Sequence, residues 1–303
     1  MRAGAALLVA GAALASAAAS AEPRRLVPTI QPLGLVVREL GGDRVGVSVL
    51  VPPGASPHIF EPQPSDVESL VAARLIIEVG GGLDGWVHPL LAAASAKPER
   101  LTLLDLPGLE PLPAAPGGHV DAGPHDAAHR LDPHAWLDPI RVRDVLVPAL
   151  AAKLAALDPP GGAAYAASRD RFVARLTALD AEIRATLADH GRSFLAFHGA
   201  WRYFAKRYDL TEVGVIEEAP GEEPTPRELG ALARRARDAR VSAILIEPQL
   251  SPRIAQMLAR DLGVALVTVD PSGDPSDPAR ASYTGLMLWN AQAFARALEG
   301  AAR

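Results

Sequence analysis

The order of the nonpolar segments constrains the fold of this chain more than any other feature. From Arg25 onward, short runs rich in Val, Ile and Leu alternate with segments of helical periodicity, and the alternation occurs twice. This pattern is typical of parallel α/β sheets, so the 303 residues predict two α/β lobes. The expected strands are residues 26–30, 45–51, 75–79, 101–105, 193–197, 212–216, 243–247 and 264–270, and the expected helices include 65–73, 227–240, 252–262 and 282–298.

One long helical segment, residues 163–190, separates the two halves and contains neither Pro nor Gly. Pro159 to Gly162 mark its start and Gly191 its stop, and about 28 residues would span roughly 40 Å. We expect an N-terminal lobe at 22–158, a bridging helix at 159–191 and a C-terminal lobe at 192–303, although an ordinary helix within one lobe is the alternative. Its nonpolar positions follow helical spacing at Tyr165, Phe172, Leu176, Leu179, Ile183 and Leu187.

The first residues have the pattern of a secretory signal peptide. Arg2 precedes a run of small nonpolar residues, and Ala19-Ser20-Ala21 fits an A-x-A cleavage site, so we expect residues 1–21 to be removed. A buried N-terminal helix is the alternative, but side chains this small would bury little area. Because the chain has no cysteine, we expect it to have no disulfides and no lipid-modified cysteine. These expectations favour the periplasm.

Charge and hydropathy exclude other classes of protein. The net charge of −5, with both signs interspersed, gives no basic stripe for nucleic acid. After the signal peptide no nonpolar run approaches the ~20 residues that span a bilayer. We therefore expect a soluble protein, acting as a monomer.

Four residues that bind metals well occur in distinctive surroundings. His58 lies in PHIFEPQPSD and His134 in DPHAWLDP, both between prolines; His198 follows SFLAF, and Asp270 follows VALVTV. No two share a helical turn, so only the fold could bring them together, two from each lobe. Imidazole nitrogens with one carboxylate oxygen suit Zn²⁺, and parallel sheets present ligands at the carboxyl ends of strands. Prolines would limit the freedom that the loops lose on binding.

Each of these residues also has a simpler interpretation. Alone, His58 is typical of a surface loop, His198 of a buried core imidazole, and Asp270 of a turn. Glu61 is a candidate partner for a ligating imidazole or a solvated side chain. His88, beside Trp86, is better explained as structural, while Glu217 and Glu218 fit either the cleft or a solvated edge.

Residues 106–132 form a segment rich in Pro, Gly and Ala that contains His119, His125 and His129. Its many helix and strand breakers predict an exposed loop within the first lobe. Whether these three histidines assist metal capture is left open by the sequence.

The motifs PHIFEPQPSD, DPHAWLDP, FHGAWRYFAKRY and IEPQLSPRIAQMLARDLGVALVTVDPSG resemble the metal-specific solute-binding proteins of bacterial ABC importers, particularly the periplasmic zinc-uptake branch. The resemblance covers nearly the whole mature chain. It implies two α/β lobes joined by one long helix, with the ion held by His58, His134, His198 and Asp270. Manganese and iron members often have a carboxylate at the position of His198, so three imidazoles favour zinc, with Mn²⁺ as the alternative. Zinc members commonly carry a longer His-rich loop at 106–132.

The expected function is capture of Zn²⁺ and its delivery to a membrane permease, without catalysis. An exported zinc hydrolase is the alternative from another class, but four protein ligands would close the shell that catalysis needs open. The chain also lacks the H-E-x-x-H, G-x-S-x-G and P-loop motifs. An adhesin or metal buffer on the same scaffold is a third interpretation.

Overall fold

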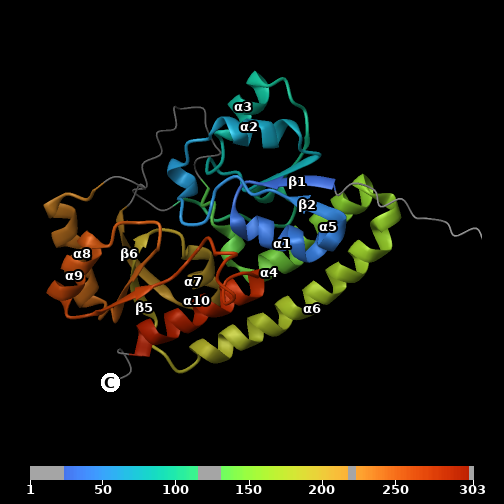
Figure 1. Ribbon diagram of the computed structural model, residues 1–303. Helices are drawn as coiled ribbons and strands as arrows, with labels where there is room; N and C mark the ends of the chain where they lie inside the picture. Colours follow the sequence, from blue (N-terminus) through green and yellow to red (C-terminus); the bar gives the residue numbers. More distant parts are fainter. Residues whose placement is uncertain (1–23, 115–130, 218–222, 300–303) are drawn as a thin grey trace, which may run out of the picture.

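The computed structural model describes residues 24–114, 131–217 and 223–299. Within these residues the chain forms two α/β lobes, each built on a parallel sheet of four strands (Figure 1). The first sheet has the order β2-β1-β3-β4, and the second has the order β6-β5-β7-β8. The strands are β1 (Arg24–Pro28), β2 (Val45–Val47), β3 (Leu75–Glu78), β4 (Glu99–Thr102), β5 (Ser193–His198), β6 (Thr211–Glu217), β7 (Ala243–Ile246) and β8 (Ala265–Thr268).

The predicted fold class is confirmed, and each expected strand has a counterpart, but several strand boundaries were wrong. The strand expected at 101–105 is β4, which ends at Thr102 because its partner β3 ends at Glu78; a 3-10 turn, Leu103–Asp105, follows. The strand expected at 45–51 is β2, which ends at Val47. Its backbone nevertheless continues to pair with the β1 side of the sheet, since Val51 N donates to Thr29 O at 2.9 Å.

The helices include the four expected from periodicity. Local chemistry explains their ends: Thr225 Oγ1 accepts a bond from Glu228 N before α8, and Gly263 ends α9 with a left-handed φ of 69°. None of the helices in the described residues is long and nonpolar enough to cross a membrane. They are α1 (Gln31–Gly41), α2 (Pro64–Val71), α3 (Val87–Ala93), α4 (Pro139–Arg141), α5 (Val147–Leu157), α6 (Gly162–Leu187), α7 (Arg202–Tyr208), α8 (Pro226–Asp238), α9 (Arg253–Leu262) and α10 (Tyr283–Leu298).

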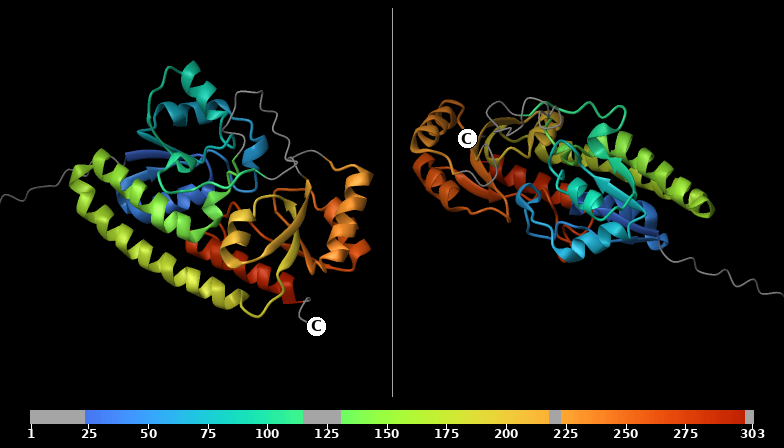
Figure 2. Two further views of the ribbon diagram at one scale, coloured as in Figure 1. Left: turned by 180° about the vertical axis from the view of Figure 1, so that it is seen from behind. Right: turned by 90° about the horizontal axis from the view of Figure 1, so that it is seen from above.

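Helix α6 is the predicted bridge. It packs against α1 and α5 of the first lobe and against α10 of the second, and it runs past both lobes in the views from the front and behind (Figures 1 and 2). The six nonpolar side chains that predicted it are all buried, each contributing roughly 1.5–3 kcal/mol. The helix ends at Leu187, three residues before the expected end of the segment at residue 190.

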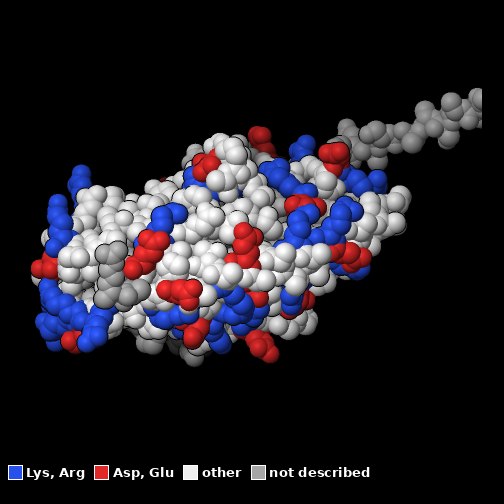
Figure 3. Space-filling model, turned by 90° about the horizontal axis from the view of Figure 1, so that it is seen from below, with Lys and Arg blue, Asp and Glu red and all other residues white. Residues whose placement is uncertain are grey.

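The two lobes share one hydrophobic core. Leu26 and Ile77 of the first sheet belong to the same buried cluster as Phe172 of α6 and Phe194 and Leu245 of the second sheet. A shared core resists separation of the lobes, because opening it would expose nonpolar area to water. On the outer face seen from below, basic and acidic side chains are interspersed (Figure 3).

Candidate metal centre

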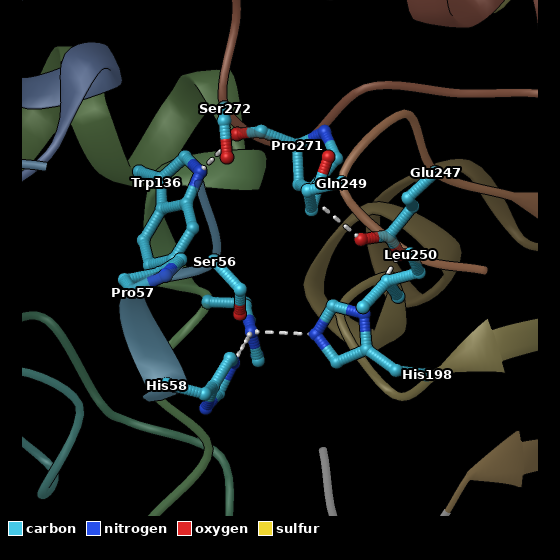
Figure 4. Close-up of a pocket in the computed structure, with 11 residues that line it drawn as sticks. Ser56, Pro57, His58, Trp136, His198, Glu247, Gln249, Leu250, Pro271 and Ser272 are labelled. Carbon is cyan, nitrogen blue, oxygen red and sulfur yellow. Dashed lines mark hydrogen bonds and ion pairs between the residues drawn. The ribbon is translucent and has the colours of Figure 1, made fainter. Parts of the chain in front are cut away.

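Three histidines from distant segments converge between the lobes. His134 Nε2 lies 3.2 Å from His58 Nε2 and 3.3 Å from His198 Nε2. One ring nitrogen from each residue lies within 4.8 Å of the others, a spacing that could hold a metal ion. Figure 4 shows His58 and His198 approaching this position from opposite sides.

Local structure accounts for the place of each imidazole. His58 lies in a 3-10 turn, Pro57–Ile59, in which proline occupies the first position and presets φ. His134 immediately precedes a second 3-10 turn, Ala135–Leu137. His198 is the last residue of β5, at the carboxyl edge of the second sheet. Two ligands therefore come from the first lobe and one from the second.

Buried carboxylates orient two of the three rings. His134 Nδ1 lies 2.9 Å from Asp132 Oδ1, and His198 Nδ1 lies 2.8 Å from Glu247 Oε1. Gln249 Nε2 in turn donates to Glu247 Oε2 at 2.9 Å. When a carboxylate accepts the Nδ1–H bond, the Nε2 lone pair is left to bind a metal. Both Nε2 atoms then face the shared position.

Sequence reasoning missed Asp132 and Glu247 as these partners and considered Glu61, which is exposed. Signals for the buried pair existed in the sequence. Asp132 stands two residues before His134 in the DPH motif. Glu247 directly follows β7, and the neighbouring strand β5 ends in His198. Adjacent parallel strands end at one edge, which places Glu247 near His198.

The protonation of the three imidazoles differs. Burial, with repulsion from His198 and His134, holds the pKa of His58 well below its usual value. Burial also lowers the pKa of His134, although the bond to Asp132 opposes the change. In His198 burial acts in the same direction, but the nearby carboxylates, Glu247 foremost, together outweigh it and the pKa is raised. Two of the rings are therefore neutral near pH 7, as metal binding requires.

The pocket around the histidines is small. Pro57, Trp136, Leu250 and Pro271 contribute to its walls, and the free volume is about 10 Å³. That volume holds about one water-sized particle. The pocket therefore fits a single ion and not an organic solute.

Asp270, the fourth expected ligand, follows β8 but does not join the histidine cluster. Its carboxylate is buried, with Oδ1 accepting bonds from Ser272 N and Gly273 N and Oδ2 accepting one from Arg280 Nη1 at 2.6 Å. Its role as a ligand stays a prediction.

The other candidates lie elsewhere. His88 contacts Glu78 and Arg100, outside the cluster, in agreement with a structural role. Glu217 pairs with His198 in the β5–β6 ladder, which puts it at the edge of the cleft. The predicted signal peptide at 1–21, Glu218 and the three histidines of the predicted loop, His119, His125 and His129, lie outside the described residues.

Comparison with known proteins places this geometry in context. Residues 26–297 match the family model described as zinc-uptake complex component A, periplasmic. The high-affinity zinc uptake system protein ZnuA of Paracoccus denitrificans is 30% identical, over 96% of this chain and 97% of that protein. The manganese-binding lipoprotein MntA of Halalkalibacterium halodurans is 28% identical, over 91% and 89%.

Solved structures agree with the sequence comparison. A crystal structure of a ZnuA deletion mutant with zinc bound superposes with a TM-score of 0.78 at 29% identity, and it covers 92% of this chain and 99% of its own. The similarity therefore extends over both lobes and the connecting helix.

Proposed function

Because the chain belongs to the periplasmic zinc-uptake complex component A family, we propose that it captures Zn²⁺ with His58, His134 and His198 and delivers it to the permease of an ABC importer. The general role, without the identity of the metal, follows from membership of the family: the chain is an extracytoplasmic, metal-binding solute-binding protein of such an importer. Proteins of this kind bind a solute without transforming it, so the chain is not an enzyme, as expected from its sequence.

The convergence of three imidazoles on one small position carries the proposal for zinc. Imidazole is a borderline-soft ligand that suits Zn²⁺, whereas Mn²⁺ prefers sites rich in oxygen. Asp270 would complete a tetrahedral shell as the fourth ligand. Manganese or iron is the alternative cargo, since similar proteins include a manganese-binding lipoprotein and the substrate-binding lipoprotein of an iron ABC transporter.

We place the mature protein in the periplasm, free of a lipid anchor. The A-x-A site before Glu22 and the absence of cysteine support this location. The partner would be the membrane permease, which receives the ion from the cleft.

Competitive loading tests the proposal. The purified protein is incubated with equimolar Zn²⁺ and Mn²⁺, desalted and analysed for bound metal. We expect zinc to be retained, and we expect His134→Ala to lose it while His88→Ala, a histidine outside the cluster, retains it. Preferential retention of manganese would assign the other cargo, and retention of zinc by His134→Ala as complete as by His88→Ala would show that the site lies elsewhere.

A further inference from the structure

The turn that carries Asp270 is attached to the edge of the metal pocket. Pro271 and Ser272, the next two residues, both line the pocket. Trp136, whose ring centroid lies 5.1 Å from that of His134, donates its indole N–H to Pro271 O at 2.8 Å. Asp270 is therefore joined directly to two residues that line the metal pocket, although its carboxylate is paired with Arg280.

The two carboxylate oxygens of Asp270 have different hydrogen-bond partners. Oδ1 accepts the backbone N–H groups of Ser272 and Gly273, both at 2.9 Å, and these bonds shape the turn. Oδ2 accepts from Arg280 Nη1 at 2.6 Å, and the two side chains are 4% and 17% exposed. A cation could take Oδ2 without disturbing the turn, provided that Arg280 released it.

Arg280 has contacts that would remain after such a release. Its Nε donates to Asp277 Oδ2 at 2.8 Å, and Asp274 Oδ2 lies 3.9 Å from its Nη2. The guanidinium also lies over the ring of Trp289, 5.1 Å from the centroid. Loss of the Asp270 contact would therefore leave Arg280 paired with other groups. The energetic cost of a buried guanidinium without a partner would not arise.

We infer that Arg280 sets the metal affinity of the site by competing with the cation for Asp270 Oδ2. The inference rests on the proposed function, since it takes Asp270 as the fourth ligand. When the cation binds, Oδ2 exchanges the guanidinium for the metal, and Arg280 stays on Asp277. When the cation leaves, Arg280 returns to Oδ2, so that the ion departs without exposing a bare carboxylate. The arginine thus weakens binding and favours delivery.

Zinc competition with a chromophoric chelator tests this exchange in the wild type, Arg280→Gln, Asp270→Asn and the double variant. A charge-assisted hydrogen bond of this kind corresponds to roughly tenfold or more in an equilibrium constant. We expect Arg280→Gln to bind zinc about tenfold more tightly than the wild type. Asp270→Asn should bind more weakly, and in that background Arg280→Gln should have no further effect.

Two further variants complete the design. Arg280→Lys keeps the charge but cannot hold Asp270 and Asp277 with a planar fork, so its affinity should fall between wild type and Arg280→Gln; it also serves if Arg280→Gln does not fold. Arg237→Gln, which removes an exposed ion pair with Asp261 in the same lobe, is the matched control and should bind like the wild type.

The outcomes separate the inference from the proposed function. If the wild type binds zinc but neither Arg280 variant binds more tightly, or if Asp270→Asn changes nothing, competition by Arg280 is refuted and the three-histidine site stands. If the wild type binds no zinc, or His134→Ala binds as well as the wild type, the proposed function itself fails.

Discussion

Glu247 offers the sharpest test of how the protein prepares its metal site. The residue is 3% exposed, and its carboxylate accepts the Nδ1–H of His198 at 2.8 Å. A hydrogen bond to a charged group contributes about 1.5–3 kcal/mol, and about 1.4 kcal/mol corresponds to a factor of ten. Removal of this contact by Glu247→Leu should therefore weaken zinc binding roughly 10- to 100-fold, the range found for outer partners of metal ligands.

Glu247→Gln separates the orientation of the ring from the charge. The glutamine Oε1 can still accept the Nδ1–H of His198, so this variant should keep most of the affinity that Glu247→Leu loses. Chelator competition at pH 7.5 measures both, with Glu182→Gln on the exposed face of α6 as the control. Equal affinities for the wild type and Glu247→Leu would refute the argument that Glu247 holds His198 in its ligating tautomer.

Three other measurements follow from the same structure. Zinc affinity should fall as the pH drops from about 7.5 to 5 because protons compete for the imidazoles; His198, with its raised pKa, should protonate first and His58 last, and pH-independent binding in chelator competition would rule out a histidine shell. Burial raises the pKa of Glu212 from 4.5 to about 7, so the folded state holds this proton more tightly than the unfolded state and the protein loses stability as the pH rises from 4.5 through 7. The free energy of unfolding of Glu212→Gln, relative to that of the wild type, should therefore be greater at pH 8 than at pH 5 by up to about 3 kcal/mol. Urea denaturation measures it, and a difference between the two proteins that does not change with pH would contradict this. Because the lobes share a core along α6, zinc loading should leave the radius of gyration in solution scattering nearly unchanged, whereas a large compaction would mean that the lobes close as rigid bodies.

The periodicity of the nonpolar residues was sufficient for the sheets and for the connecting helix. In α6 the six predicted positions are all buried, because a helix that packs along one side must repeat its nonpolar residues with the helical period. Helix α1 was not among the helices expected from the sequence. Nine of the eleven residues of Gln31–Gly41 are buried, and Pro32 and Gly34 near its start are residues that usually break helices.

The sequence was sufficient to identify the three histidines of the site, but not the contacts of the carboxylates around them. His58, His134 and His198 stood out because of their motifs, and the fold brings them together. The orientation of a carboxylate is decided by contacts between distant segments, such as His198 with Glu247 or Asp270 with Arg280. Composition and spacing do not specify these contacts, so the sequence left the alternatives for Asp270 and Glu61 open.

The three imidazoles are not equivalent, and the difference bears on how the ion leaves. His134 and His198 are each held at Nδ1 by a buried carboxylate, whereas in the described residues no side chain bonds to Nδ1 of His58. His58 is also half-buried, in a loop of the first lobe. Since the shared core opposes wide separation of the lobes, movement at the site has to come from the loops. His58 is the ligand that can withdraw at the smallest cost in broken contacts, so its loop is where we expect release to begin.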